Sequence, residues 1–494
     1  MKTLSEILAF LKYPCQHIEE KSIRAIYQDH RKCRENDIFI ALSGKHHDGH
    51  HYIAKAEAKG VSLIIAEDLT RLPQRHPTNN VVEITNIREK LSELANWFYD
   101  APSTKCPLFA VTGTNGKTSV SHFIAQILSA FSQTGVLGTV GNGIYPTLIE
   151  STHTTLDNLS LQALLNRYIH EGARNIVIEA SSHALAQKRL DKIAIDTAIF
   201  TNLDTDHLDY HGSMQAYFKA KISLFNMSGL QRGVINIDNE YGKTLYQKLQ
   251  KHTALPSCLS YSVKDKNADC CFEMLMLKST GIKVNIYWQK QFITCMYLPI
   301  IGRFNVSNIA ASFAAVVASG YPIHQVLKAL KTLKNVEGRL EHLSFARQPL
   351  VVIDYAHTPD ALENVLRAVK AQTTGKLICV FGCGGDRMHD KRAKMGEIAE
   401  KYADFSIVTE DNNRYENFAH IKADIVRGFK AESKRYTVIP NREKAISHAL
   451  TYANEQDVIL LAGKGHERYL EKNGKRHFFD ERAIVKKAFD HNQP

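Results

Sequence analysis

The sequence predicts an α/β protein of three domains: a small N-terminal domain, a central domain with a mostly parallel sheet and a P-loop-type phosphate site, and a C-terminal doubly wound, Rossmann-like domain. The chain of 494 residues is longer than one compact core usually accommodates. Apolar runs alternate with helical spacing over two long segments, which is typical of parallel sheets covered by helices. The apolar runs end in polar or glycine-rich loops, and open sheets of this kind bind ligands at the carboxyl ends of their strands.

The predicted domains cover residues 1–105, 106–334 and 335–494. In the first domain, apolar runs at 37–42 and 61–66 lie on either side of a short helix predicted from Tyr52 to Lys59. The loop between them contains four histidines among residues 45–51, but consecutive histidines lack the spacing that builds one defined metal site. A solvated or phosphate-facing loop is the better interpretation.

The central segment opens with the stretch from Leu108 to Ser119, LFAVTGTNGKTS. Its apolar run predicts a buried strand, and the apolar spacing from Val120 onward predicts a helix. Backbone N–H groups at a glycine-bracketed loop before a helix can bind phosphate, Lys117 can reach the β- and γ-phosphates, and Thr118 can ligate Mg²⁺. Val111 replaces the first glycine of the usual pattern, so a chance strand-to-helix turn is the alternative to ATP binding.

Further strands of the central sheet are predicted at 175–180, 197–203 and 233–238. Two of them end in unusually polar loops, with Glu179 in the first and the His207-Leu208-Asp209-Tyr210-His211 run in the second. From Cys270 to Pro299 the runs become shorter and alternate, which predicts an antiparallel insertion.

The last segment predicts four parallel strands at 350–353, 376–381, 405–408 and 458–461. Each is followed by a charged or glycine-rich loop. Pro359 lies at the first turn of a predicted amphipathic helix, where its missing N–H is tolerated. These four loops predict a second ligand-binding edge.

Composition narrows the function class. The net charge of +11 comes from basic residues scattered among acidic ones, which disfavours nucleic-acid binding and suits small polyanionic substrates. Nine cysteines without a C-x-x-C pair predict reduced thiols. We expect a cytoplasmic protein without a membrane span, because the sequence lacks both a signal-like N-terminus and an apolar run of about 18 residues. We also expect a monomer.

The motifs and their order resemble those of the Mur ligases over nearly the whole chain. The loop T-G-T-N-G-K-T also resembles that of the folylpolyglutamate synthases. The resemblance is carried by residues 112–119, 179–183, 206–212, 220–225, 302–308, 338–339, 354–359, 384–387 and 463–467. Any one of these motifs alone would be weak, whereas their common order is specific.

The resemblance implies an ATP site and two Mg²⁺ ions. It implies catalytic roles for Lys117, His207 and Lys221, with Lys221 carried as a carbamate that ligates the second metal; a surface helix lysine is the alternative. The implied ATP-binding residues are Gly113, Thr114, Asn115, Gly116, Lys117, Thr118, Ser119, Asn305, Arg339 and Asp354. The implied metal ligands are Thr118, Glu179, His207 and Lys221. Helix caps, ion pairs and turns are the alternative roles for each residue singly.

The resemblance also implies two substrate sites. The implied ligands of the UDP-sugar peptide are His30, Lys45, His46, His47, His153, Thr154, Thr155, Ser181, Gln187 and Arg189, with His30 standing where the family usually has Ser. The implied ligands of the incoming amino acid are Arg387, Asp411, Asn412, Asn413, Arg414, Gly463 and Glu467. Asn413 replaces the Pro of the family's Asp-Asn-Pro-Arg sequence, which marks enzymes that add meso-diaminopimelate.

The reaction implied is ATP-dependent amide formation in peptidoglycan biosynthesis. The γ-carboxylate of D-glutamate in UDP-N-acetylmuramoyl-L-alanyl-D-glutamate would form an acyl phosphate, and meso-diaminopimelate would capture it. A guanidinium at Arg414 would bind the distal carboxylate that lysine lacks. The alternatives are the same reaction with L-lysine, a folylpolyglutamate synthase-like ligase, and a nucleotide-gated scaffold without turnover.

Overall fold

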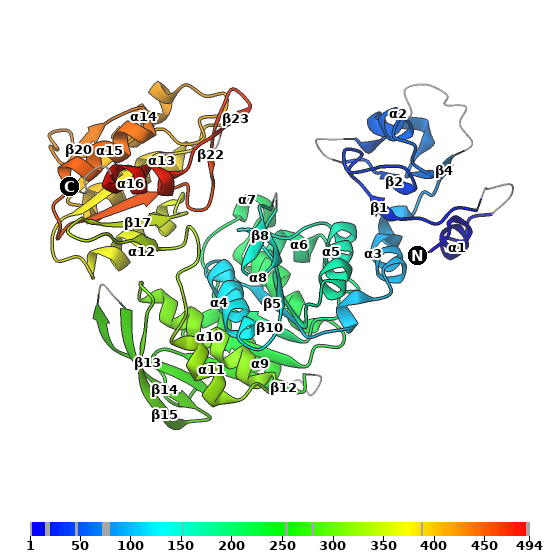
Figure 1. Ribbon diagram of the computed structural model, residues 1–494, viewed down its shortest axis with the longest axis horizontal. Coiled ribbons are helices and arrows are strands. Elements are labelled where there is room, and N and C mark those ends of the chain that lie inside the picture. The colour runs from blue at the N-terminus through cyan, green and yellow to red at the C-terminus, as the bar shows by residue number, and fades with distance from the viewer. Residues whose placement is uncertain are drawn as a thin grey trace. The chain divides into compact units, whose positions relative to one another are not determined.

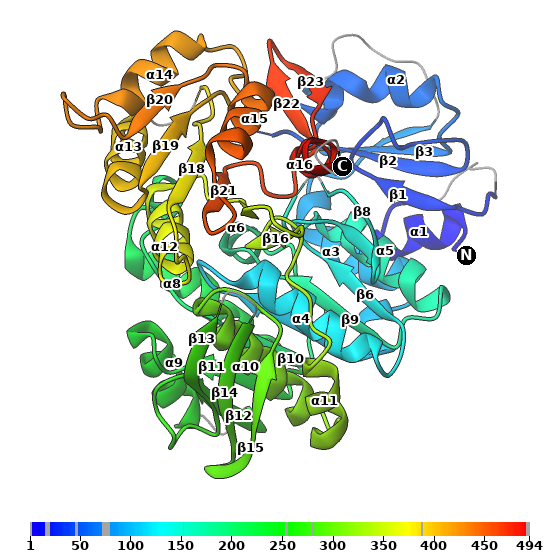
Figure 2. The same cartoon turned by 60° about the vertical axis from the view of Figure 1, so that its left-hand side comes forward.

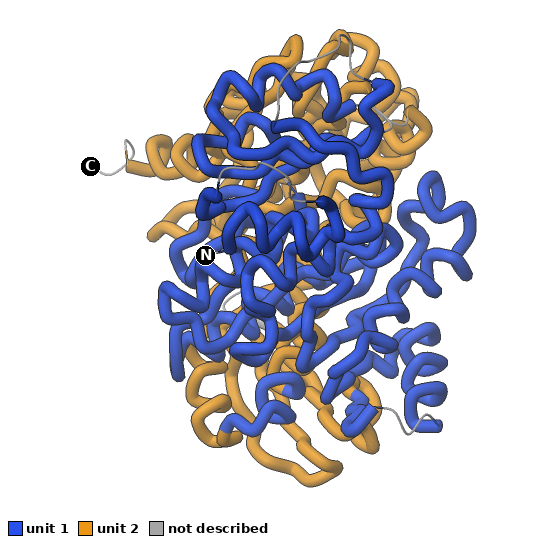
Figure 3. The backbone as a smooth tube through the Cα atoms, turned by 90° about the vertical axis from the view of Figure 1, so that its right-hand side faces the viewer, with its two compact units in different colours: residues 1–260, 314–321 blue, residues 261–313, 322–494 orange. Residues whose placement is uncertain are grey.

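The computed structural model describes residues 2–14, 20–44, 48–71, 80–151, 153–251, 255–278, 281–386 and 389–490. The chain forms two compact units, one made of residues 1–260 with 314–321 and the other of residues 261–313 with 322–494 (Figure 3). The domain boundaries near 105 and 334 stay a prediction.

The first unit begins with a parallel four-stranded sheet in the order β1-β2-β3-β4 (Figure 1). Strand β2 is buried along its whole length because helices cover both faces of the sheet. The strands are β1 (Ala25–Tyr27), β2 (Asp37–Ala41), β3 (Leu63–Ala66) and β4 (Val81–Glu83), and the helices are α1 (Leu4–Phe10), η1 (Gly49–Tyr52), α2 (Ile53–Glu57), η2 (Leu69–Arg71), α3 (Ile87–Phe98) and η3 (Pro102–Thr104).

A second sheet in this unit carries the phosphate loop. Strands β11, β10, β5, β9 and β6 are parallel neighbours in this order, and β7 and β8 continue the sheet antiparallel. The strands are β5 (Leu108–Thr112), β6 (Thr134–Leu137), β7 (Asn142–Ile144), β8 (Thr147–Ile149), β9 (Asn175–Glu179), β10 (Thr197–Phe200) and β11 (Arg232–Asn236). The helices are α4 (Lys117–Ser129), α5 (Asn158–His170), α6 (Ser182–Ala186), α7 (Leu208–His211), α8 (Met214–Ile222), η4 (Ser223–Asn226) and α9 (Glu240–Gln250).

The predicted antiparallel insertion is present in the second unit. Strands β13 (Cys270–Lys278), β14 (Gly281–Trp288) and β15 (Gln291–Leu298) pair antiparallel in sequence order. Strand β12 (Ser257–Ser262) runs from the first unit into the second, and its last two residues pair with the start of β13. Helices α10 (Phe304–Ala318) and α11 (Ile323–Leu330) follow.

The C-terminal sheet is doubly wound, with the order β16-β17-β21-β18-β19-β20 (Figure 2). Alternate residues of each strand face opposite layers: Val352 packs with α12, α13 and α14, whereas Val351 and Ile353 pack with α15 and α16. The strands are β16 (Glu341–Leu343), β17 (Leu350–Asp354), β18 (Leu377–Phe381), β19 (Phe405–Val408), β20 (Tyr436–Val438) and β21 (Val458–Ala462). The remaining elements are α12 (Pro359–Lys370), α13 (Asp390–Tyr402), α14 (Phe418–Val426), α15 (Arg442–Tyr452), β22 (Tyr469–Lys472), β23 (Lys475–Phe478) and α16 (Glu481–Asp490).

The predicted strands agree with the structure within a few residues. The helix predicted from Tyr52 to Lys59 differs, since a 3-10 turn occupies Gly49–Tyr52 and the α-helix covers only Ile53–Glu57. The tight turn forms because the Asp48 carboxylate accepts the His50 N–H at 3.0 Å, which caps it one turn earlier than apolar spacing indicates. Within the described ranges, no helix is both long and apolar enough to cross a membrane.

Helix α12 gives a direct test of the C-terminal core. Leu366 is fully buried, whereas its neighbour Arg367 is 65% exposed. Leu366→Ala removes apolar contacts and leaves a cavity, so it should lower the free energy of unfolding in urea by about 2–5 kcal/mol. Arg367→Ala should change it by less than about 0.5 kcal/mol. Equal effects of the two substitutions would show that α12 does not pack as described.

Candidate functional site

The loop after β5 has the backbone that phosphate binding requires. Gly113 and Gly116 have φ values of +152° and +86°. A Cβ atom on Gly113 would lie 1.8 Å from the Thr201 hydroxyl oxygen, which itself donates to the Asn115 carbonyl at 2.6 Å. The loop therefore lies against the end of β10 at a position that only glycine can occupy.

Two lysine side chains converge on the carbonyl of Gly113. Lys117, the first residue of α4, donates to the Gly113 and Thr114 carbonyl oxygens at 2.9 Å each. Lys221 from α8 donates to the same Gly113 oxygen at 2.7 Å and is 1% exposed. Burial lowers the pKa of Lys221 well below its usual range, and the positive charge of Lys117 lowers it further. Burial and the nearby charge therefore both act against the protonated form of Lys221.

Polar residues that follow β10 bind the phosphate loop. Asn202 accepts the N–H of Thr114 through its carbonyl and the N–H of Asn115 through its side chain, at 2.9 and 2.8 Å. The Asn115 amide donates to Asp204 at 3.2 Å. The predicted ATP-binding run is therefore rigidly held by the neighbouring strand end.

The predicted metal ligands Thr118 and Glu179 lie together. The Thr118 hydroxyl donates to Glu179 Oε2 at 2.9 Å, and Glu179 is fully buried at the end of β9. Thr139 donates to both carboxylate oxygens, through its N–H at 2.7 Å and its hydroxyl at 3.1 Å. A carboxylate beside a hydroxyl is a hard oxygen donor set, which fits Mg²⁺ completed by phosphate and water oxygens.

The second predicted metal region contains three histidines. His207 adopts a left-handed backbone conformation, φ +52°, before α7. Its ring centroid lies 4.9 Å from that of His183 and 6.2 Å from that of Tyr217. Burial lowers the pKa of His183, His207 and His211, so the neutral imidazoles available as ligands are favoured.

Several residues predicted to bind the UDP substrate form one network. The Thr155 hydroxyl donates to the Glu179 carbonyl at 2.7 Å and accepts the Ser181 N–H at 3.1 Å. Arg189 donates to the Thr155 carbonyl at 2.8 Å and to Gln187 at 2.9 and 2.6 Å. This network connects the substrate candidates directly to the Glu179 strand.

Thr154, His153 and His30, which are also predicted to bind the UDP substrate, contact other residues. Thr154 accepts a hydrogen bond from the Thr139 hydroxyl at 3.1 Å, and the His153 carbonyl accepts one from Ser151 at 2.7 Å. His30 stacks on Tyr52 with ring centroids 4.3 Å apart. Lys45, His46 and His47 lie outside the described residues.

The second unit contains three residues predicted to bind ATP, Asp354, Arg339 and Asn305, and each contacts other residues of the same unit. The Asp354 carboxylate accepts the N–H groups of Leu340 and Ala356 at 2.8 and 2.9 Å, and burial raises its pKa. Arg339 lies over the Tyr355 ring at 5.0 Å. Asn305 is 2% exposed, and its amide donates to the Ile301 carbonyl at 2.7 Å.

The predicted amino-acid residues meet at the ends of β19 and β21. Asn412 donates to Glu467 Oε2 at 2.9 Å. Gly463 has φ +113°, and a Cβ there would lie 2.5 Å from Asp411 Oδ2, so the close approach requires glycine. Although burial alone would raise the pKa of Asp411, Lys464 and Arg442 hold it below its usual range.

Arg414 follows in a left-handed conformation, φ +52°. Its guanidinium donates to the Gly385 carbonyl at 2.7 Å and lies 3.9 Å from the Glu471 carboxylate. Its backbone is bound on both sides by the β22–β23 hairpin, through bonds to Glu471 O at 3.0 Å and from Asn473 N at 2.6 Å. Asn413 is buried beside it, and Arg387 lies outside the described residues.

Sequence reasoning assigned no role to Lys464 and Arg442, which are both buried cations at 0% exposure. Arg442, at the start of α15, donates to the carbonyls of Glu410 and Ala462 at 3.2 and 2.8 Å and to the Glu481 carboxylate at 2.8 Å. It thereby joins the ends of β19 and β21. Only Lys464 carried a sequence signal, because it lies within the Gly463–Glu467 motif.

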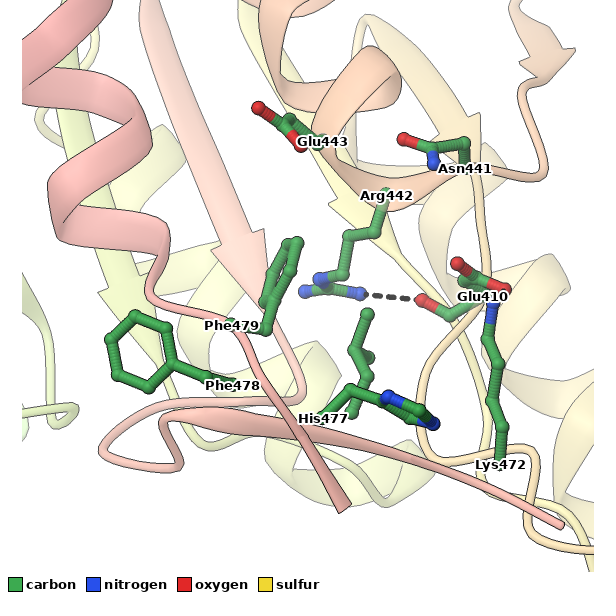
Figure 4. A pocket seen from close by; sticks show the side chains of 9 residues that line it. Glu410, Asn441, Arg442, Glu443, Lys472, His477, Phe478 and Phe479 are labelled. Atoms are coloured by element: carbon green, nitrogen blue, oxygen red, sulfur yellow. Dashed lines mark hydrogen bonds and ion pairs between the residues drawn. The ribbon is translucent and has the colours of Figure 1, made fainter. Parts of the chain in front are cut away.

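A pocket of about 320 Å³ opens beside Arg442 (Figure 4). Figure 4 shows the Arg442 side chain directed toward Glu410, and Lys472 forms an ion pair with the Glu410 carboxylate at 2.6 Å. The pocket is lined by Glu410, Asn441, Arg442, Glu443, Leu470, Lys472, His477, Phe478 and Phe479. Charged groups of both signs line it, and Arg442 pairs with Glu481, which lies outside this lining, so the lining does not favour one ligand charge.

Comparison with known families gives three matches along the chain. Residues 22–99 match the model of the Mur ligase family catalytic domain, residues 111–316 that of the Mur ligase middle domain, and residues 338–465 that of the Mur ligase glutamate ligase domain.

Two relatives carry the same protein name, UDP-N-acetylmuramoyl-L-alanyl-D-glutamate–2,6-diaminopimelate ligase. The Pseudomonas aeruginosa protein is 42% identical over 469 residues, which cover 94% of this chain and 95% of the relative. The Haemophilus influenzae protein of strain PittGG is 41% identical over 457 residues, covering 89% and 91%.

Solved structures agree with this result. A structure with the same protein name is 35% identical, with a TM-score of 0.66 and 95% of each chain covered. MurF ligase from Thermotoga maritima in complex with ADP is 19% identical, with a TM-score of 0.67 and coverage of 89% and 93%. Folylpolyglutamate synthase from Mycobacterium tuberculosis is 18% identical, with a TM-score of 0.61 and coverage of 76% and 92%. The last two show a shared fold.

Substituting Gly113 tests whether the contact between the phosphate loop and Thr201 requires glycine. Gly113→Ala places a Cβ against Thr201 and should weaken ATP binding by about tenfold or more, because the loop N–H groups must move. Gly229→Ala is the matched control, since Gly229 has φ +86° but open space around it. Calorimetric titration with ATP measures both, and equal weakening would contradict the described loop geometry.

Proposed function

The chain belongs to the Mur ligase family, and from this membership we propose that it joins meso-diaminopimelate to UDP-N-acetylmuramoyl-L-alanyl-D-glutamate in peptidoglycan biosynthesis, with cleavage of ATP. The observation that carries the proposal is the 42% identity, over 94% of the chain, to a relative named for this reaction. The phosphate loop and the strand-end residues of the second unit supply chemistry that suits it.

The reaction proceeds in two steps. A γ-carboxylate oxygen of the D-glutamate attacks the γ-phosphorus of ATP, so that a new O–P bond forms, the bond to the β-phosphate oxygen breaks and ADP leaves. The amine of the incoming amino acid then attacks the acyl carbon, phosphate departs and the nitrogen loses a proton to solvent. Phosphoryl transfer of this kind depends on positioning and on neutralising phosphate oxygens.

The phosphate loop provides both requirements. Lys117 turns from the carbonyls of Gly113 and Thr114 to the phosphates when ATP is bound, and the loop N–H groups bind phosphate oxygens. Thr118 and Glu179 would hold one Mg²⁺, and His207 with Lys221 would hold a second. Bound Mg²⁺ neutralises phosphate charge.

Lys221 acts in this proposal as a carbamate. Its neutral amine attacks the carbon of CO₂, an N–C bond forms, and the proton released from nitrogen passes to water. The product is an oxygen ligand in place of a cation. Two observations support this chemistry: Lys221 is buried, and its pKa is held low by burial and by Lys117.

The second unit selects the amino acid. Arg414 binds the distal carboxylate of meso-diaminopimelate, with Arg387 at the other carboxylate and Glu467 at the ammonium group. Asp411, Asn412 and Asn413 form the loop that carries Arg414, and Gly463 permits the close approach of the two strand ends. Lysine lacks the distal carboxylate, so it would leave the guanidinium without its anionic partner.

The donor substrate binds in the first unit. Thr155, Ser181, Gln187 and Arg189 bind the peptide portion of the UDP substrate, which suits their network beside Glu179. His30, Lys45, His46, His47, His153 and Thr154 complete that site. The protein acts as a monomer in the cytosol, where ATP is available.

The amino-acid choice is tested by ligation with meso-diaminopimelate and with L-lysine at equal concentrations. The wild type should release phosphate and form product with meso-diaminopimelate. Arg414→Ala should lower kcat/KM for this substrate by about 100-fold or more, since it removes paired charge-assisted hydrogen bonds, and should narrow the preference over lysine. Arg427→Ala, a 73% exposed arginine, is the control. A preference for lysine in the wild type, or an unchanged preference in Arg414→Ala, would overturn the assignment.

The carbamate is tested by labelling. Protein equilibrated with ¹³C-bicarbonate should show a carbamate carbon signal by NMR that is absent from Lys221→Ala and present in Lys219→Ala, a variant of an exposed lysine on the same helix. Lys221→Ala should lose most activity and regain part of it with added acetate, which supplies the missing carboxylate oxygens. A fully active Lys221→Ala variant would remove this residue from the site.

A further inference from the structure

A buried lysine lies beneath the amino-acid loop of the second unit, and the mechanism above does not use it. We propose that Lys464 is a positioning residue for recognition of the incoming amino acid, acting through Asn412 and Glu467. This inference rests on the proposed function and deepens it, because it identifies what fixes the geometry of the selecting residues.

Lys464 contacts both Asn412 and Glu467. Its ammonium group donates to Asn412 Oδ1 at 2.9 Å and to Glu467 Oε2 at 2.8 Å. The Asp411 carboxylate lies 3.7 Å away, and the Tyr469 ring centroid lies 4.9 Å away. One fully buried cation therefore binds residues from both strand-end loops.

These contacts determine how the Asn412 amide is turned. Its oxygen accepts from Lys464 and also from the Glu471 N–H at 2.9 Å, while its nitrogen donates to Glu467 Oε2 at 2.9 Å. Turning the amide over would place donors against donors and an oxygen against a carboxylate. Lys464 thus fixes one orientation of Asn412.

The same network reaches Arg414. Glu471, whose N–H is bound to Asn412, accepts the Arg414 N–H through its carbonyl at 3.0 Å. The side chain of Glu471 also lies 3.9 Å from the Arg414 guanidinium. Loss of the Lys464 ammonium would loosen Asn412 and, through Glu471, the backbone that carries Arg414.

Glu467 is fixed in a similar way. Its Oε2 accepts from Lys464 and Asn412, and its Oε1 accepts a long bond from the Tyr355 hydroxyl at 3.4 Å. A carboxylate held by donors at both oxygens is preorganised for the ammonium group of a substrate.

Burial of an ammonium group is costly, and an apolar side chain of similar volume often stabilises a protein equally well. Packing alone therefore does not explain a lysine at this place. A role in positioning Asn412 and Glu467 explains the lysine, because methionine would fill the same space without binding either residue.

The test compares Lys464→Met, Lys464→Gln and Lys464→Arg in the full chain. Lys464→Met should raise KM for meso-diaminopimelate by about tenfold or more, since two charge-assisted hydrogen bonds are lost, while KM for ATP stays unchanged. Lys464→Gln should be intermediate, and Lys464→Arg should recover part of the affinity. Unfolding midpoints in urea monitor whether each variant is folded.

Lys472→Met is the matched control, because Lys472 pairs with Glu410 and is 44% exposed. It should leave KM for meso-diaminopimelate unchanged. A folded Lys464→Met variant with the wild-type KM would overturn the proposal, as would a loss of folding in both Lys464→Met and Lys464→Gln, which would assign Lys464 to stability alone.

Direct calorimetric binding separates this inference from the proposed function. If the wild type binds meso-diaminopimelate without ligating it, the reaction is wrong, and weaker binding by Lys464→Met still supports the positioning role. If the wild type neither ligates nor binds this amino acid, both proposals are overturned.

Discussion

One carbonyl oxygen, that of Gly113, accepts hydrogen bonds from both Lys117 and Lys221. Protonating both amines at one buried acceptor costs free energy, because burial removes water and the two positive charges repel each other. As a result, burial and the nearby Lys117, at the start of α4, hold the pKa of Lys221 well below its usual range. The cradle is thus prepared for added negative charge, which phosphate groups supply.

The second unit also has buried cations at the ends of its strands. Buried Arg442 and Lys464 lie behind the ends of β19 and β21. Arg442 is bound to a carboxylate and to two backbone carbonyls, and Lys464 to a carboxylate and to the Asn412 amide oxygen. These cations hold two loops together that are far apart in sequence. Parallel strands bring the loops to one edge, and the buried charges fix how their side chains are turned.

Much of this could be predicted from sequence. The run from Leu108 to Ser119 contains the strand, the glycines and the helix spacing, so β5, the loop and α4 could be located without coordinates. The alternation in the last segment likewise predicted β17, β18, β19 and β21, since these strands are buried on both faces and read as apolar runs.

Other features depend on contacts that no local pattern shows. The sharing of Gly113 by Lys221 joins residues 108 positions apart. Nothing in the local sequence around Asn413 shows that the β22–β23 hairpin binds the backbone of Arg414 on both sides. Arg442 lies in a stretch with no motif at all. These residues acquire their roles only when the sheet brings distant strand ends together, and the roles of the site residues themselves rest on the family resemblance.

In the proposed reaction, phosphoryl transfer from ATP activates the γ-carboxylate of the D-glutamate. Substrate labelled with oxygen-18 in that carboxylate, incubated with ATP and meso-diaminopimelate, tests it most directly. The phosphate released should carry one labelled oxygen for each amide bond formed, because the acyl phosphate leaves one carboxylate oxygen on phosphorus. Amide formation with unlabelled phosphate would contradict it.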